Sequence, residues 1–138
     1  MLDRILKEYG QDVRLVFKDF PLEFHPLARP AHEAARCAGT FNKYWAYHDR
    51  LFRDQPAFSR ADLLRYARDL GIPADAFAQC LDSGRFRRPV EADVEQGRQL
   101  GVTGTPTFFI NGVPLVGAAP YEAFKEAIDQ ALREAGKR

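Results

Sequence analysis

Gly101-Val-Thr-Gly-Thr-Pro-Thr-Phe-Phe-Ile-Asn-Gly112 is the most informative stretch of this sequence. It contains the apolar run Thr107–Ile110, and a second apolar run, Val113–Val116, follows after only Asn111 and Gly112. Asn-Gly between two apolar runs is a strong hairpin signal, because both residues tolerate the positive φ of a type I′ turn. The stretch therefore predicts an antiparallel β-hairpin.

The chain before this hairpin opens with a helix and a strand. Leu2, Ile5, Leu6 and Tyr9 recur at helical spacing before Gly10, which predicts a short opening helix. Residues 13–20 are rich in β-branched and aromatic side chains and end at Pro21, which predicts a strand.

Between this strand and the hairpin the pattern is helical. Ser59 followed three residues later by Asp62 is typical of a capping box at a helix start. Pro120 opens a last helix after the hairpin, with apolar residues on one side. The intervening helices are expected at residues 30–38, 41–52, 59–70, 73–81 and 86–100.

The domain organisation follows from this order of elements. We find no internal repeat, low-complexity tract or linker, so the sequence predicts a single domain over residues 1–138. Its core is expected in residues 1–25 and 101–138, with a helical insertion at residues 26–100.

Charge and composition argue against several classes of partner and site. Twenty Lys and Arg residues stand against nineteen Asp and Glu, which does not favour nucleic acid or an anionic membrane. No apolar run approaches the roughly 18 residues of a membrane span, and the chain as written has no export signal. Its two cysteines and its three histidines, His25, His32 and His48, lack metal-ligand spacing, so we expect no metal and no cofactor.

Three segments of the sequence resemble the DsbA family of thioredoxin-fold proteins. Residues 101–112 look like the family's cis-proline loop and hairpin, and residues 17–26 (Phe-Lys-Asp-Phe-Pro-Leu-Glu-Phe-His-Pro) look like its second core strand and exit loop. Residues 45–52, with Tyr-His-Asp at 47–49, are similar to a helix of its insertion. The resemblance implies an α/β thioredoxin-like fold with an inserted helical subdomain.

The resemblance also implies what is missing. In the family, a strand and a Cys-x-x-C turn precede the first helix, and this chain begins within that helix. We therefore expect a truncated member without the central N-terminal strand and without the redox-active cysteine pair. No residue of the chain is expected to be catalytic.

Thr105 and Pro106 are the candidate binding residues. In the family, the bond before this proline is cis and the neighbouring backbone pairs with an extended substrate peptide. The resemblance therefore implies an extended peptide or protein as a partner at this loop. The alternative is that the bend only starts the strand at Thr107.

Cys37 and Cys80 have two structural interpretations. Thioredoxin chemistry needs a thiolate at a helix N-terminus and a second thiol two residues away, and these cysteines lie 43 positions apart. They are either small buried apolar side chains or, as the resemblance to the family suggests, a structural disulfide across the insertion.

Two hypotheses for the function follow. The favoured one is a non-redox binding or structural protein of DsbA ancestry. The alternative is a fragment or mis-started form of an active DsbA-type thiol-disulfide oxidoreductase, whose relatives act outside the cytoplasm. Because a missing central strand would leave the opening helix poorly covered, we also expect a homodimer with Leu2, Ile5, Leu6 and Tyr9 near the two-fold contact.

Overall fold

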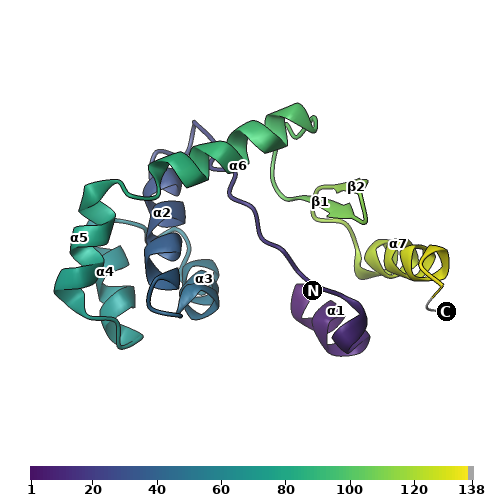
Figure 1. Cartoon of the computed structure of the whole chain (residues 1–138), viewed down its shortest axis with the longest axis horizontal. Helices are drawn as coiled ribbons and strands as arrows, with labels where there is room; N and C mark the ends of the chain where they lie inside the picture. The colour runs from purple at the N-terminus through teal and green to yellow at the C-terminus, as the bar shows by residue number, and fades with distance from the viewer. Residues whose placement is uncertain (137–138) are drawn as a thin grey trace. The chain divides into compact units, whose positions relative to one another are not determined.

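The computed structural model describes residues 1–136 of the 138-residue chain. The chain divides into two compact units. The first consists of Met1–Lys18 together with the part from Gly101 onward, and the second is Asp19–Leu100. Figure 1 shows the order of the elements along the chain.

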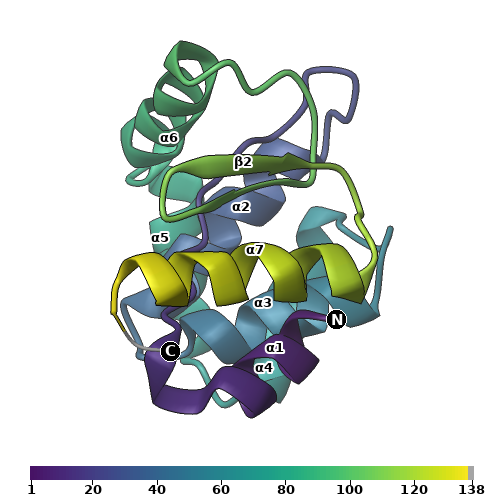
Figure 2. The ribbon, with the colours of Figure 1, turned by 90° about the vertical axis from the view of Figure 1, so that its right-hand side faces the viewer.

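The first unit contains a β-hairpin and two helices. Strands β1 (Thr107–Ile110) and β2 (Val113–Val116) pair in antiparallel register, with Phe109 opposite Pro114. Asn111 and Gly112 form the turn with φ of 48° and 85°, so the predicted positive-φ turn is confirmed. Helices α1 (Leu2–Tyr9) and α7 (Tyr121–Glu134) lie on the same side of the hairpin (Figures 1 and 2), and the 3-10 helix η1 (Gly10–Asp12) follows α1.

The core of this unit lies where α1, α7 and the hairpin meet. Ile5 and Tyr9 of α1 are buried among residues of α7. The rings of Phe108 and Phe124 are edge-to-face with centroids 4.7 Å apart, which joins β1 to α7. The α7 residues of this cluster are Phe124, Ile128 and Leu132.

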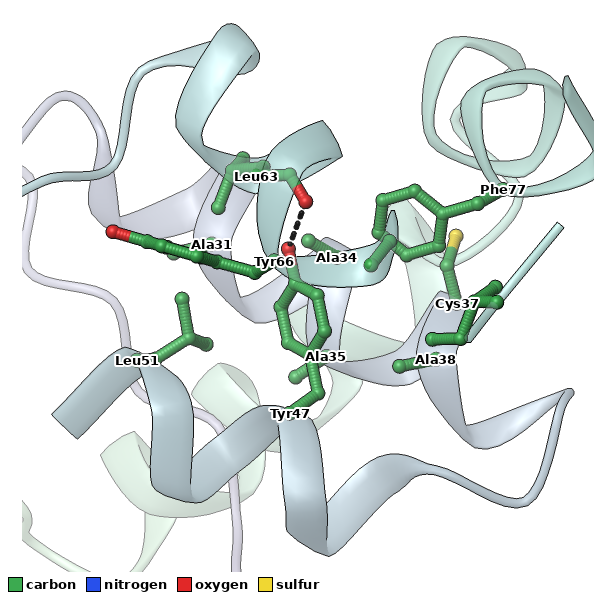
Figure 3. Packing of buried hydrophobic residues seen from close by; sticks show 12 residues of the cluster. Ala31, Ala34, Ala35, Cys37, Ala38, Tyr47, Leu51, Leu63, Tyr66 and Phe77 are labelled. Carbon is green, nitrogen blue, oxygen red and sulfur yellow. Dashed lines mark hydrogen bonds between the residues drawn. The ribbon is translucent and has the colours of Figure 1, made fainter. Parts of the chain in front are cut away.

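The second unit is a block of five helices. Their bounds are α2 (Ala28–Gly39), α3 (Tyr44–Arg53), α4 (Arg60–Asp69), α5 (Ala74–Ser83) and α6 (Arg87–Gln99). Buried alanines on α2 allow aromatic side chains of α3, α4 and α5 to pack closely in the middle of the unit (Figure 3). The buried Tyr47 hydroxyl donates a 2.9 Å hydrogen bond to the carbonyl of Leu63, so the polar group does not remain unsatisfied.

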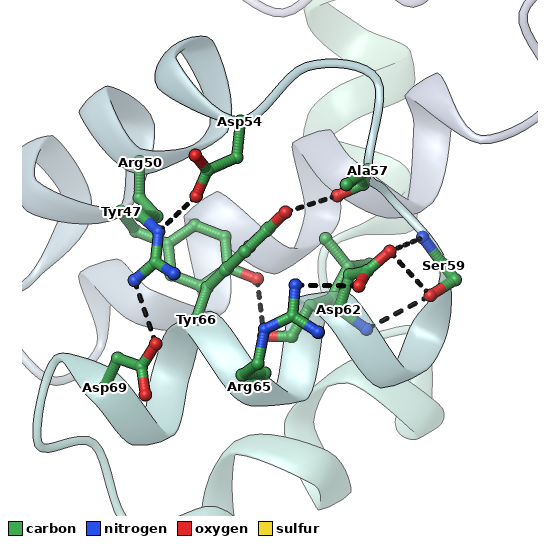
Figure 4. A network of polar contacts seen from close by, with 10 residues as sticks. Tyr47, Arg50, Asp54, Ala57, Ser59, Asp62, Arg65, Tyr66 and Asp69 are labelled. Atoms are coloured by element: carbon green, nitrogen blue, oxygen red, sulfur yellow. Dashed lines mark hydrogen bonds and ion pairs between the residues drawn. The ribbon is translucent and has the colours of Figure 1, made fainter.

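Polar contacts fix the ends of α3 and α4 (Figure 4). Ser59 and Asp62 form the predicted capping box, with each side chain accepting a bond from the other residue's backbone N–H. The guanidinium of Arg50 binds Asp54 and reaches Asp69 at 3.0 Å. It also lies over the ring of Tyr66, 4.6 Å from the centroid.

The strand predicted at residues 13–20 is absent, and that prediction is wrong. Burial alternates along residues 13–19 as in a strand, with Leu15 half-buried and Val16 55% exposed. A strand also requires a hydrogen-bonded ladder, and within residues 1–136 the only sheet is the pair β1–β2. The segment therefore has the side-chain pattern of a strand without belonging to a sheet.

The helix boundaries differ from the predicted ones by a few residues. The helix expected from residue 41 begins at Tyr44, because Asn42 has φ of 60° and ends the preceding turn. No helix of the described residues is long and apolar enough to cross a membrane.

Candidate functional site

The outer edge of β1 is the first feature of the candidate site. The N–H of Gly117 donates a 2.9 Å bond to the carbonyl of Pro106, which identifies this pair as hydrogen-bonded. Hydrogen-bonded and non-hydrogen-bonded pairs alternate along an antiparallel ladder. The pairs of Thr107 with Val116 and of Phe109 with Pro114 are therefore non-hydrogen-bonded. The backbone N–H and C=O of Thr107 and Phe109 consequently point away from β2.

The two edges of the hairpin are not equivalent. Pro114 sits at a position of β2 where its backbone nitrogen points outward, and proline has no N–H to donate. The outer edge of β2 therefore lacks a donor in its middle. The outer edge of β1 has a complete set of donors and acceptors, and in the described residues no strand pairs with it.

The loop before β1 places the predicted binding residues at the start of this edge. Thr105 and Pro106 are both exposed, and the peptide bond between them is cis. The Thr107 hydroxyl donates a 2.7 Å bond to the carbonyl of Gly104, and Pro106 is held by Gly117 as described above. Thr105 and Pro106 therefore come directly before Thr107, the first residue of β1 whose backbone groups point away from β2.

The two cysteines lie in the helical unit, and they are not spaced as a Cys-x-x-C pair. Cys37 of α2 and Cys80 of α5 form a disulfide, with Cα atoms 6.0 Å apart. Cys37 is buried and Cys80 is half-buried. Because these are the two cysteines of the sequence, the chain has no free thiol in this structure.

A buried charged cluster around Asp19 was not predicted from the sequence. Asp19 is 3% exposed and accepts hydrogen bonds from His32 Nδ1 at 2.8 Å and from Arg36 Nε at 2.5 Å. Arg36 also donates to Asp93 at 2.8 Å. Burial by itself would raise the pKa of Asp19, but the hydrogen bonds and charges of His32 and Arg36 outweigh it and hold that pKa below its usual value.

Only part of this cluster has a signal in the sequence. His32 and Arg36 are one helical turn apart, so they share a face of α2. Their partners Asp19 and Asp93 come from segments distant in the sequence, and no local pattern joins them. Within residues 1–136, no group of His, Cys, Asp or Glu side chains could hold a metal ion.

The residues expected at a dimer contact occupy different environments. Ile5 and Tyr9 are buried against α7, and the Tyr9 hydroxyl donates a 2.7 Å bond to Asp129. Leu2 is half-buried against the same cluster, and Leu6 is 37% exposed. The expected exposed patch is therefore wrong for Ile5 and Tyr9, because α7 covers them. The homodimer itself stays a prediction.

Comparison with known proteins gives the family. The family model described as Thioredoxin matches residues 1–130. A protein named Na(+)/H(+) antiporter NhaA 3 from Salinispora tropica is 38% identical over 127 residues, which is 91% of this chain and 20% of that protein. The Na(+)/H(+) antiporter NhaA 1 of Salinispora arenicola is 38% identical over 122 residues, or 88% of this chain and 19% of that protein.

A third relative also matches most of this chain and about a fifth of its own length. The Na(+)/H(+) antiporter NhaA of Herminiimonas arsenicoxydans is 36% identical over 117 residues, covering 84% of this chain and 18% of that protein. The chain thus spans about a fifth of the length of the curated relatives it matches. No solved structure matches it. The chain belongs to the Thioredoxin family, as a thioredoxin-like α/β domain in which helices α2 to α6 are inserted between α1 and the hairpin.

Proposed function

We propose that this chain is a polypeptide-binding domain of DsbA ancestry that accepts an extended segment as an added strand along β1, beside Thr105 and Pro106. The observation that carries the proposal is the outward direction of the N–H and C=O groups of Thr107 and Phe109. An extended peptide can satisfy all four groups at once, which is the mode of recognition called β-augmentation.

The energetics favour such a ligand. Each hydrogen bond formed contributes about 0.5–1.5 kcal/mol net, so the backbone alone provides affinity without a fixed sequence. The hairpin also directs the ligand to one side, because Pro114 removes a donor from the edge of β2. The exposed loop at Thr105 extends the same surface beyond the strand.

The same proposal assigns no redox step to this chain. Disulfide exchange requires a thiolate attacker, and both cysteines of the sequence are bonded to each other in the helical unit. Binding without thiol chemistry is therefore the function that the described residues support best.

Nuclear magnetic resonance tests the binding directly. Titration of ¹⁵N-labelled protein with a soluble extended peptide should shift the amide signals of Thr107 and Phe109. Phe109→Pro removes an outward N–H of β1 without removing a bond to β2, and it should abolish the shifts. The matched control Val116→Pro removes an outward N–H from β2 instead, and it should bind normally. Equal loss in both variants, with folding retained, would contradict binding along β1.

Family membership favours a second candidate, a part of an active DsbA-type thiol-disulfide oxidoreductase. Insulin reduction and oxidation of a reduced model protein test it on this 138-residue polypeptide. We expect no turnover above background. Turnover that disappears in Cys37→Ala or Cys80→Ala would overturn the non-redox assignment.

The names of the relatives favour a membrane transporter as the protein with which this domain works. The three relatives above are named Na(+)/H(+) antiporters, and each is about five times longer than the matched region. Inverted membrane vesicles that contain an antiporter of this kind test the idea. The rate of Na⁺/H⁺ exchange in these vesicles should change when the domain is added. An unchanged rate with the wild-type domain and with Phe109→Pro would contradict this partner.

A further inference from the structure

Three exposed arginines, Arg85, Arg87 and Arg88, lie at the turn from α5 to α6, and we call them the arginine cluster. Most arginines that the structure describes form ion pairs with carboxylates, among them Arg29 and Arg60. Within residues 1–136, no ion pair involves the arginine cluster. The chain itself therefore leaves these three positive charges uncompensated.

The carboxylates closest to the arginine cluster in the sequence are bound to other arginines. Asp82 accepts two hydrogen bonds from Arg60, at 3.1 and 2.7 Å. Glu91 lies 3.0 Å from Arg29. These pairs leave the guanidinium donors of the cluster to a ligand from outside the chain.

The arginine cluster also opposes the electrostatics of α6. The N-terminal end of a helix has a partial positive charge, which favours acidic side chains and disfavours basic ones. Helices α1, α4, α5 and α7 accordingly have an acidic residue in the first turn. Helix α6 has none there and begins with Arg87 and Arg88. A local rule that is broken without a compensating contact is expected where the sequence serves a function.

The turn holds two of the three guanidinium groups in place. Gly84 has φ of 68°, and Nη2 of Arg87 lies 3.1 Å from the position that a Cβ of this glycine would occupy. The guanidinium of Arg85 lies over the ring of Phe86, 5.1 Å from the centroid, and Phe86 packs against the core of the helical unit. Because these side chains already rest on the turn, a ligand pays less side-chain entropy to order them.

We infer that the arginine cluster binds a short acidic segment of another protein, with neighbouring Asp or Glu side chains. Guanidinium groups bind carboxylates through paired N–H donors, and arginine clusters are a recurrent means of recognising acidic motifs. All residues of this site belong to the helical unit. The inference therefore does not rest on binding along β1.

An acidic peptide fits the arginine cluster better than an anionic membrane does. The side chains of Asp82 and Glu91, which flank the cluster in the sequence, are 56% and 51% exposed. A flat anionic surface would repel both carboxylates. Basic membrane-binding segments also contain about four to eight Lys or Arg residues, more than the cluster has. A narrow peptide can place its carboxylates on the arginines alone.

Nuclear magnetic resonance of ¹⁵N-labelled protein with two end-capped peptides tests the inference. The acidic peptide is Gly-Ser-Glu-Asp-Glu-Gly-Ser, and the neutral one is Gly-Ser-Gln-Asn-Gln-Gly-Ser. We expect the acidic peptide to shift the amide signals of Arg87 and Arg88, and the neutral peptide to leave them unchanged. Added salt should weaken the binding, because exposed charges are screened.

Two triple variants separate the cluster from net charge. Replacing the three arginines of the cluster with Gln should weaken binding of the acidic peptide about tenfold, the combined effect of three exposed ion pairs. The matched control removes the same charge from exposed positions in three separate segments, through Arg14→Gln, Lys43→Gln and Arg68→Gln. It should bind as the wild type does. The cluster variant should unfold at the same or a higher denaturant concentration, since it relieves the conflict at α6.

Each contrary outcome has a distinct meaning. Equal affinity of the two triple variants would reduce the effect to net charge and overturn the inference. Acidic-peptide shifts confined to Thr107 and Phe109 would place that peptide on β1 and also overturn it. Cluster-dependent sedimentation with phosphatidylserine–phosphatidylcholine vesicles, without binding of the peptide, would assign the arginines to a membrane instead. A lower denaturation midpoint of the cluster variant would make them part of the fold and overturn the inferred ligand.

Discussion

The backbone N–H of Asp19 donates a 2.9 Å hydrogen bond to the carboxylate of Asp93. Arg36 donates to the carboxylates of both residues, which compensates their negative charges. The contact fixes the first residue of the helical unit to α6, although that residue lies outside any helix or strand. The cluster is thus an anchor for an otherwise irregular segment.

Asp19→Asn tests this anchor. The substitution leaves Arg36 and His32 facing a neutral amide, and breaking a buried charged pair costs about 3 kcal/mol. Chemical denaturation should show this loss in the free energy of unfolding at neutral pH. The matched control Asp82→Asn disrupts an exposed pair with Arg60, and it should leave the denaturation midpoint nearly unchanged. Equal midpoints for wild type and Asp19→Asn would contradict the anchor.

The stability difference between wild type and Asp19→Asn should decrease as the pH falls. The folded state lowers the pKa of Asp19 from its ordinary 3.8, so the unfolded state binds the proton more readily. The contribution of this group is therefore complete above the unfolded pKa and is lost as pH falls through the lower folded pKa. The stability difference between wild type and Asp19→Asn should be constant from neutral pH down to about pH 5 and shrink below about pH 4.

The disulfide between Cys37 and Cys80 should contribute strongly to the stability of the helical unit. It closes a loop with a sequence separation of 43 residues, for which the loss of unfolded-state entropy corresponds to about 4 kcal/mol. Reduction, or the double substitution to alanine, should lower the denaturation midpoint, and thiol counting under denaturing, non-reducing conditions should find no free thiol. Two free thiols per chain in material purified under oxidising conditions would contradict the bond.

Local features could be predicted from the sequence, and long-range ones could not. The Asn111-Gly112 turn and the Ser59-Asp62 capping box each depend on residues a few positions apart. Strand formation at residues 13–20 depends on a pairing partner, which the side-chain pattern does not report. The burial of Tyr9 likewise depends on α7, whose residue Asp129 lies 120 positions away.

Of the four apolar residues of α1 expected at a dimer contact, Leu6 is the most exposed, because α7 covers Ile5 and Tyr9. If this residue lies at a two-fold contact, Leu6→Glu should shift the protein toward the monomer, since it brings two like charges together. Light scattering at micromolar concentration measures the change. A well-folded wild-type species of 15.7 kDa would exclude the dimer.

Gly112→Ala should weaken peptide binding through the shape of the hairpin alone. Gly112 has φ of +85°, and an added Cβ would meet no atom within 4 Å, so any cost comes from the backbone conformation rather than from a clash. Residues other than glycine pay about 1–2 kcal/mol in this left-handed region, and the loss falls on the turn that holds β1 and β2 in register. Gly104→Ala is the matched control, because that glycine also has open space around it and does not have a positive φ.

We expect Gly112→Ala to lower hairpin stability by about 1–2 kcal/mol and to bind extended peptides more weakly. Gly104→Ala should leave both hairpin stability and peptide binding unchanged. Amide hydrogen exchange at Phe108 and Ile110 reports hairpin stability, and the titration at Thr107 and Phe109 reports binding. If amide exchange showed the hairpin of Gly112→Ala to be unfolded and the variant still bound peptide as tightly as the wild type, the edge of β1 could not be the binding surface.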